Sequence, residues 1–440
     1  MKRRLCILAL LALTTGVMAQ EEGLKIDVNF LTRGEVRAGG LSSSKSEDKG
    51  EEAEEGEEEI DKNFAAFILE RTLFGAGYTK SDFSFQLTAQ HSGTWGSSEG
   101  GIFNVYEAWV KMGSKNGFFA KIGRQNLSYD DQRIFGADDW AMTARSHDVL
   151  KLGYEGHGHK VHVIGGFNQN PSNMSGGTYY EGDLQPYKAI EALWYHYDTP
   201  RTNLGASLIF MNMAMQGSIT AISMKTFQQQ LAGAYLSFTP KKWNVEAAYY
   251  HQFGDDASGL PIDAWMTSAK VIFSPSVHWS FKAGYDYLSG DEDFATPAEG
   301  NLGMMRHETI HGFSSLNGSH HKFFGAMDFF YVTTYVNGFT PGLQNAYVGL
   351  SCDPVGRLSF DTSYHFLATA TKLRNADKPL GHEFEVSASL DITKEATLSA
   401  GYTFMSGTET MVVLKRSSDK RELHWGWIML SVTPKFLSNK

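Results

Sequence analysis

Segments in which apolar and polar residues alternate at every second position constrain this chain more than any other feature. One lies at 83–90, and the pattern returns at 279–287, 358–366 and 383–392. In the first, one face carries Phe83, Phe85, Leu87 and Ala89, and the other carries Ser84, Gln86, Thr88 and Gln90. Period-two alternation gives a β-strand one apolar and one polar face, in a soluble sandwich as in a membrane barrel. The segments run about 9–13 residues, which is the length that a tilted strand needs to cross a bilayer.

The connections between these segments are short and long in turn. The short ones are 78–81, 114–117, 156–159, 198–202, 240–242, 275–277, 353–356 and 393–396, and the long ones are 39–62, 95–102, 126–147, 170–186, 214–226, 255–261, 289–341, 371–381 and 406–422. This order predicts an all-β fold, a transmembrane antiparallel β-barrel of about eighteen strands, with short periplasmic turns and long extracellular loops. A barrel of that size encloses water. The faces of 187–197 and 423–433 are ambiguous, and 323–336 could form a further strand.

The first residues predict export from the cytoplasm. Residues 1–19 combine a basic start, an apolar stretch and a small-residue cleavage site, which is the pattern of a signal peptide. Without them only Cys352 remains, so no internal disulfide can form. We expect residues 20–440 to form a single barrel in the outer membrane, since no later apolar run is long enough for a spanning helix. Candidates for its interfacial aromatic girdles are Trp243, Trp279 and Tyr364.

Much of the negative charge is local. The formal charge is -10, and the segment KSEDKGEEAEEGEEEIDK at 45–62 lies in the first predicted extracellular loop, 41–62. A block of like charges is usually a solvated surface segment, but it could also bind divalent cations that bridge to surface lipid. No basic region suits nucleic acid, so the expected partners are small hydrophilic solutes and outer-membrane lipid.

An unusual density of arginine and aspartate occupies the third predicted loop, 126–147. The run 123–148 reads GRQNLSYDDQRIFGADDWAMTARSHD and contains Arg124, Asp130, Asp131, Arg133, Asp139, Trp140, Arg145 and Asp148. Strand-like segments at 118–123 and 149–154 flank it. Opposite charges this dense need a wet, enclosed environment, and the lumen of a barrel provides one.

This run resembles the signature of the alginate-export family of outer-membrane barrels. The segments TRGEVR (32–37), ERT (70–72) and VYEAWV (105–110) also match, as do YDYLSGD (285–291) and GSHHKFFGAMDFFYV (318–332). The resemblance implies an eighteen-stranded barrel with a charged lumen and an inward loop that narrows it. It places the residues of the run at that constriction and adds wall charges at Arg33, Glu35, Arg37, Arg71 and Glu107. Leu73 departs from the family, which often has a second basic residue there, and periplasmic secretion partners remain an open expectation.

A charged lumen suggests a passive channel for small hydrophilic solutes. Arginines in a narrow aqueous lumen raise the local anion concentration and bind carboxylates in bidentate fashion. The solutes are therefore expected to be anionic, and the resemblance favours sugar acids or short oligosaccharides. The aspartates leave an alternative, in which Arg–Asp pairs only brace the loop. Trp140 is either a packing anchor or a platform for a sugar ring, and the whole barrel could instead be a non-conducting structural or adhesive protein.

An isolated protease-like motif is present at 307–311. HETIH matches the H-E-x-x-H pattern, in which His307 and His311 bind zinc and Glu308 acts as the base. That chemistry needs a helix, and a cluster of glycine and serine follows instead. His320 and His321 lie nearby, and the four histidines could bind a metal adventitiously or simply be solvated. We predict neither a catalytic site nor a cofactor or metal.

Overall fold

The chain folds into a single closed barrel. The computed structural model describes residues 22–39, 64–138, 140–171, 175, 177–180, 185–217, 225–291, 308–329, 340–373, 376–415 and 422–438. Each strand pairs antiparallel with its neighbour along the chain, and β1 (Gly23–Ala38) closes the ring by pairing with both β2 (Phe64–Lys80) and β18 (Glu422–Val432). The predicted signal peptide 1–19 and the acidic segment 41–62 lie outside the described residues.

The circumference of the barrel is eighteen strands. β19 (Lys435–Ser438) pairs with the same edge of β1 as β18, so it continues β18 rather than adding a position. The strands between β2 and β18 are β3 (Phe83–Thr94), β4 (Ile102–Gly113), β5 (Phe118–Gln125), β6 (His147–Gly156), β7 (His159–Phe167), β8 (Ala189–Asp198), β9 (Leu204–Gln216), β10 (Thr226–Phe238), β11 (Trp243–Asp255), β12 (Pro261–Phe273), β13 (Trp279–Leu288), β14 (Leu343–Val355), β15 (Leu358–Ala368), β16 (Pro379–Asp391) and β17 (Ala396–Gly407). A short helix, α1 (Glu409–Lys415), follows β17. The predicted fold and strand number are confirmed.

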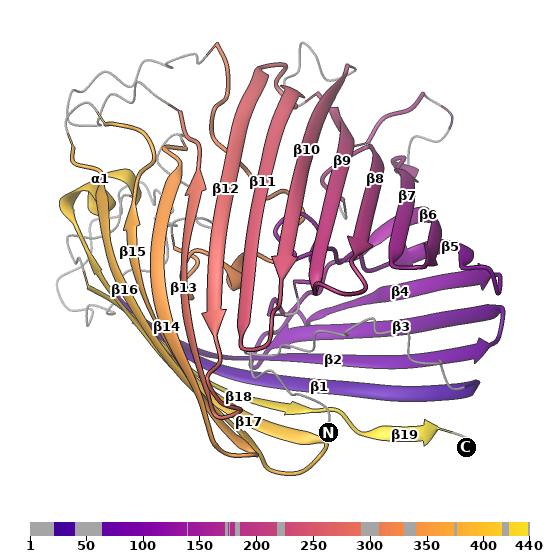
Figure 1. The fold of residues 1–440 in the computed structure, drawn as a ribbon, viewed down its shortest axis with the longest axis horizontal. Coiled ribbons are helices and arrows are strands. Elements are labelled where there is room, and N and C mark those ends of the chain that lie inside the picture. Colours follow the sequence, from indigo (N-terminus) through magenta and orange to yellow (C-terminus); the bar gives the residue numbers. More distant parts are fainter. Residues whose placement is uncertain are drawn as a thin grey trace.

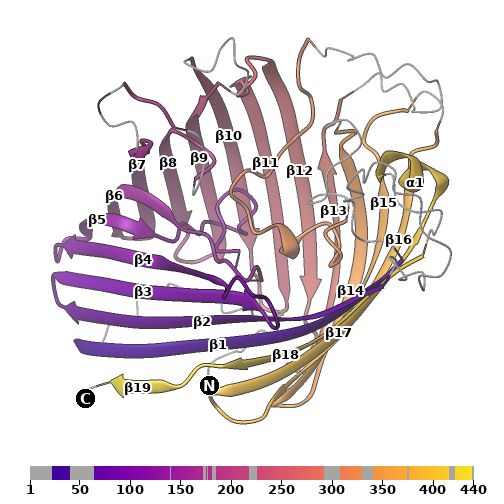
Figure 2. The same ribbon diagram turned by 180° about the vertical axis from the view of Figure 1, so that it is seen from behind.

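The two ends of the barrel differ as the sequence predicts. Short turns join β2 to β3 and β4 to β5 at one end, and longer connections leave the other end (Figure 1). Seen from behind, the segment after β5 and the one that carries the short helix η4 (His320–Lys322) cross the interior (Figure 2). Among the described residues, no helix is long and apolar enough to span a membrane.

Alternation sorts the side chains between the outside and the lumen. On β3, Leu87 is 51% exposed on the outward face, while Thr88 beside it is buried toward the inside. The girdle candidates Trp243, Trp279 and Tyr364 are all exposed. In a barrel that spans the outer membrane, this exposed apolar face contacts lipid, so burial from water is completed by the bilayer.

The ambiguous segments are now resolved. β8 turns Trp194 inward and Leu193 outward, and β18 turns Trp425 inward and Ile428 outward. The suggestion of a strand at 323–336 is wrong for residues 323–329, which form turns and irregular backbone. The rest of that stretch lies outside the described residues.

Candidate functional site: the charged lumen

Two segments fold into the barrel and join each other there. Residues 126–146 leave β5 and return to β6, and residues 308–329 belong to the connection between β13 and β14. Phe135 and Asn317 form a parallel bridge, and the amide of Gly136 donates to the Asn317 carbonyl at 2.9 Å. The sequence predicted only the first inward segment. Its glycine- and serine-rich partner carried no period-two signal and was interpreted as an external loop.

Arg133 is the centre of the first inward segment. Its side chain is 3% exposed and pairs with Asp131 at 2.8 Å and with Asp286 of β13 at 2.7 Å. The guanidinium also lies over the ring of Phe323, 4.0 Å from the centroid. Burial lowers the pKa of Arg133, but the two carboxylates more than offset it and raise the pKa above its ordinary value. This arginine therefore fixes the loop to the wall and is not available to a solute.

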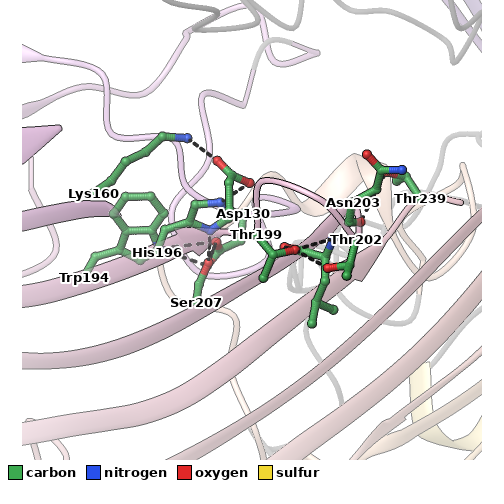
Figure 3. A network of polar contacts seen from close by, with 11 residues as sticks. Asp130, Lys160, Trp194, His196, Thr199, Thr202, Asn203, Ser207 and Thr239 are labelled. Carbon is green, nitrogen blue, oxygen red and sulfur yellow. Dashed lines mark hydrogen bonds and ion pairs between the residues drawn. The ribbon is translucent and has the colours of Figure 1, made fainter. Parts of the chain in front are cut away.

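Asp130 attaches the same loop to the barrel wall at β8 and β9. Its carboxylate accepts hydrogen bonds from Trp194 Nε1 of β8 and from Ser207 Oγ of β9 (Figure 3). Burial is the largest cause that raises the pKa of Asp130 to about 6, although both hydrogen bonds act to lower it. Part of the loop's attachment therefore titrates near neutral pH.

A polar chain continues from Asp130 along the wall. His196 Nδ1 lies 2.7 Å from Ser207 Oγ, and His196 Nε2 lies 2.9 Å from Asp198 Oδ1. Asp198 in turn accepts from Lys160 at 3.2 Å. Sequence analysis did not anticipate this serine–histidine–aspartate arrangement. Ser207 is buried and its hydroxyl donates a hydrogen bond to Asp130, so its proton is not directed at His196 as nucleophilic activation requires.

Trp140 is partly buried and packs against groups of the barrel and of the second inward segment. The ring of His321 stacks on it at 4.2 Å, and the Arg33 guanidinium lies 4.0 Å from its centroid. Trp425 and Trp427 meet its edges. These contacts are those of a packing anchor.

The predicted wall charges on β1 and β2 support this anchor. Arg33 Nη1 donates to the Trp140 carbonyl at 3.1 Å, and Arg71 Nη1 donates to the Ala141 carbonyl at 3.0 Å. Glu35, 2% exposed, lies between Arg33 at 2.8 Å and Arg37 at 2.7 Å. Only the Arg37 side chain, at 43% exposure, offers its charge to water in this group.

The remaining predicted lumen charges make longer contacts. Arg145 is 27% exposed, lies 3.6 Å from Asp138, and donates to the carbonyls of Leu316 and Gly318. Glu107 of β4 accepts from Trp109 Nε1 at 3.2 Å. Asp139 lies outside the described residues.

Arg124 and Asp148 are not in the lumen, which corrects their placement at the constriction. They form a bidentate pair with both bonds at 2.8 Å, directly opposite each other on β5 and β6. Two residues along each strand, Ile122 and Leu150 face outward and are 58% and 40% exposed. Because side chains alternate, Arg124 and Asp148 share that outward face. The sequence run crosses from loop to strand at its ends, and only its middle lies inside.

The histidines near the protease-like motif are placed individually. His307 lies outside the described residues, and 308–311 form bends and a bridge rather than a helix. His311 Nδ1 lies 2.8 Å from the Asp263 carbonyl. His321 is largely buried and bonds to Asp328 at 2.7 Å, so the expectation of solvated loop histidines is wrong for it. Among the described residues, no group of three or more His, Cys, Asp or Glu could hold a metal.

A row of three lysines on the lumen wall was missed by the sequence analysis. Lys111 of β4 pairs across the sheet with Lys121 of β5, which pairs with Lys151 of β6. The ammonium groups of this lysine row lie over rings of Phe119, Trp109 and Tyr129, at 4.4, 3.8 and 5.8 Å. Within the described residues, none of them makes an ion pair with a carboxylate. A count outward from the predicted turn 114–117 places Lys111 opposite Ala120, one residue away from the observed register, so it would not have shown the row.

Three other lysines of the lumen wall have acidic partners. Lys160 bonds to Asp198 at 3.2 Å, and Lys270 bonds to Glu246 at 2.6 Å. Lys282 bonds to Asp361 at 3.1 Å. The lysine row therefore differs from these three lysines in having no contacting carboxylate.

Comparison with known proteins identifies the family. A family model described as Alginate export matches residues 100–377. Two Pseudomonas aeruginosa structures, OccK11 (OpdR) and OpdL, are each 12% identical with a TM-score of 0.60 over 96% of this chain and 99% and 100% of theirs. Pseudomonas aeruginosa OccK2 (OpdF), in complex with glucuronate, is 14% identical with a TM-score of 0.59 over 94% of this chain and 98% of that one. No curated protein matches the sequence. The chain belongs to the alginate export family, and it is an integral outer-membrane β-barrel with the fold of the outer-membrane porins.

Proposed function

We propose that this protein is a passive channel for small hydrophilic anions, with sugar acids and short acidic oligosaccharides as the favoured solutes. The observation that carries the proposal is the lysine row across β4, β5 and β6. Like charges directly opposite each other on a sheet destabilise it. Glu107 and Glu155 act on the row electrostatically but do not contact it, and a passing anion could supply the contact that the lysines lack.

The aromatic rings explain how the lysines remain available. A ring face attracts an ammonium group without neutralising its charge, so each lysine is held in position but can still bind an anion. A sugar acid could place its carboxylate on the lysines and its apolar ring face near Trp109. Binding of this kind is weak and shared among several groups, as conduction requires.

The constriction contributes more to the width of the solute path than to its charge. Of the residues predicted there, Arg133 and Asp131 are saturated by each other and by Asp286. Arg37 and Arg145 keep a substantial exposed fraction, so we assign these two arginines to the solute path. A structural neighbour crystallised with glucuronate supports the sugar-acid class for a barrel of this shape.

Single-channel recording in planar bilayers tests the proposal. The wild-type protein should give stepwise conductance and a reversal potential, under a salt gradient, that shows preference for anions. Changing Lys111, Lys121 and Lys151 together to glutamine should remove most of that preference while leaving the steps. Absence of steps would favour the non-conducting barrel, and steps with unchanged selectivity in the triple variant would contradict the assignment of the lysine row.

A further inference from the structure

A belt of paired polar side chains surrounds half of the outward face. The same contact recurs in five successive hairpins, from β9–β10 to β17–β18. In each hairpin an outward residue of the first strand bonds diagonally to an outward residue of the second strand. The second residue is the one that pairs with the position two residues after the first. The pairs are Asn212–Gln228 at 2.7 Å, His251–Asp263 at 2.9 Å, Tyr285–Gln344 at 2.7 Å, Tyr364–His382 at 2.6 Å and Tyr402–His424 at 2.7 Å. We call these ten residues the outer polar belt.

The outer polar belt lies at the upper edge of the apolar surface. Its members are near the strand ends that lead to the long loops, and exposed apolar residues follow on the periplasmic side, among them Leu208, Phe281 and Ile428. An outward apolar band that ends in a polar ring marks the level where hydrocarbon gives way to headgroups. The belt therefore meets the headgroups of the outer leaflet.

Two neighbouring pairs of the belt share one design. On β15 and β16, His382 lies opposite Phe366 and diagonal to Tyr364, with ring centroids 5.3 and 5.9 Å apart. On β17 and β18, His424 lies opposite Phe404 and diagonal to Tyr402, at 5.2 and 6.2 Å. The sequence repeat Tyr-x-Phe followed by an opposing histidine thus holds two imidazole rings in matching orientations.

Both imidazoles can present a donor to the lipid. Tyr364 and Tyr402 each place a hydroxyl on Nδ1 of their histidine, and a phenol that donates there leaves the proton on Nε2. In the described part of the chain, no protein group bonds to either Nε2. By contrast, Nε2 of His251, the third histidine of the belt, is already bonded to Asp263.

The spacing of the two donors limits the ligand. His382 and His424 are two strands apart and, through β17, two residues out of level. With usual strand spacings this separates them by about 12 Å. One phosphate cannot bridge that gap, but a disaccharide headgroup with a phosphate at each end spans a comparable distance.

We propose that Tyr364, His382, Tyr402 and His424 form a docking site for the phosphorylated diglucosamine headgroup of an outer-leaflet glycolipid. The acyl chains of this lipid would cover the apolar surface below, near Phe384 and Ile428. The aromatic rings fix the imidazoles, and the two Nε2–H groups donate to the two phosphates. The site is independent of solute selectivity, because all four side chains are on the outside of the barrel.

Native mass spectrometry of the detergent-solubilised protein tests the proposal. The probe is diglucosamine lipid with both phosphates, compared with the same lipid after phosphatase treatment and with phosphatidylethanolamine. We expect the bisphosphorylated lipid to bind at least tenfold more tightly than either. The double variant His382→Phe/His424→Phe keeps the aromatic packing but removes both donors, so it should lose that advantage.

His251→Phe is the matched control. It removes an outward histidine of the same belt whose Nε2 is already bonded to Asp263, and it should leave lipid binding unchanged. Equal binding of the dephosphorylated lipid, or an unaltered affinity in the double variant, would overturn the proposal. Thermal unfolding of each variant confirms that the barrel is intact. Conductance and ion selectivity should be unaffected, so failure here is distinguishable from failure of the anion channel.

Discussion

Charges of the inward loop 126–146 and of the lysine row both lie inside the barrel, yet they are partnered in opposite ways. Arg133 in the loop is enclosed by two carboxylates and an aromatic ring. Lys121 in the row faces two further lysines and rests on Trp109. A charge enclosed by opposite charges, which we call saturated, holds the backbone of its loop in place. A charge without a contacting counter-charge, which we call unsaturated, can still attract a mobile ion. The comparison separates the residues that shape the lumen from those that select a solute.

The largest expected effect comes from removing a saturated charge of the inward loop. Arg133→Met leaves Asp131 and Asp286 buried without their cation, and loss of one partner of a buried pair costs about 3–5 kcal/mol. The inward loop should detach from β13, so the unfolding free energy falls and single-channel conductance rises. Denaturant titration and bilayer recording measure the two effects.

Arg145→Met is the comparison for that change. Arg145 is 27% exposed and its acidic partner, Asp138, is 3.6 Å away, so we expect a loss of less than about 1 kcal/mol. If the two variants lost equal stability, the distinction between saturated and available charges within the loop would not hold.

Removing an unsaturated charge of the lysine row should change the ion selectivity of the channel. Lys121→Gln removes the middle charge of the row, and the anion/cation permeability ratio should fall roughly threefold, equivalent to about 0.7 kcal/mol. The double variant Lys270→Gln/Glu246→Gln removes a paired lumen lysine together with its carboxylate, so the charge of the lumen does not change and the permeability ratio should stay at the wild-type value. Reversal potentials of both variants under the same salt gradient measure the difference. Equal shifts in the two would mean that pairing is irrelevant to selectivity.

Asp130 makes the stability that the inward loop contributes depend on pH. Its pKa is raised to about 6 from an ordinary value of 3.8, so the folded protein holds this proton more tightly than the unfolded chain. The associated stability is complete below about pH 4 and is lost as the pH rises through about 6. Asp130→Asn should match the wild type in acid and be the more stable of the two at pH 7.5, by roughly 1–3 kcal/mol.

Thermal unfolding at pH 4.5 and pH 7.5 checks this sign. The variant should show a smaller change between the two conditions than the wild type. The opposite result, a variant that is weaker at pH 7.5, would mean that the ionised carboxylate strengthens the bonds from Trp194 and Ser207 enough to outweigh its burial.

The barrel could be predicted because its strands are specified locally. A single period-two segment such as 83–90 fixes which side of the wall each residue occupies, and the alternation of short and long connections fixes the direction of each strand. The segment 323–329 misled because its apolar and aromatic residues pack inside the lumen, where they need no strand periodicity. Burial inside a wide barrel is a tertiary property, and sequence spacing does not report it.

The functional site was harder to predict because it depends on pairing. The run 123–148 showed which charges lie near each other in the sequence, but the partner of Arg133, Asp286, is far along the chain. Lys111, Lys121 and Lys151 were each unremarkable in their own strands. Only the register of β4, β5 and β6 makes them a row. A register count from the predicted turn at 114–117 is one residue off and pairs Lys111 with Ala120, so it does not find the row.

The smallest expected effect concerns the outward pair, Arg124 and Asp148. Because both side chains share the face of Ile122 and Leu150, Arg124→Ala should leave conductance and ion selectivity unchanged. The pair is partly exposed, so its loss should cost no more than about 1 kcal/mol of stability. A matched measurement on Lys121→Gln in the same bilayers shows that a change in selectivity is detectable. If Arg124→Ala shifted the reversal potential as much as Lys121→Gln, Arg124 would have to reach the solute path, and the assignment of inward and outward faces on β5 would be wrong.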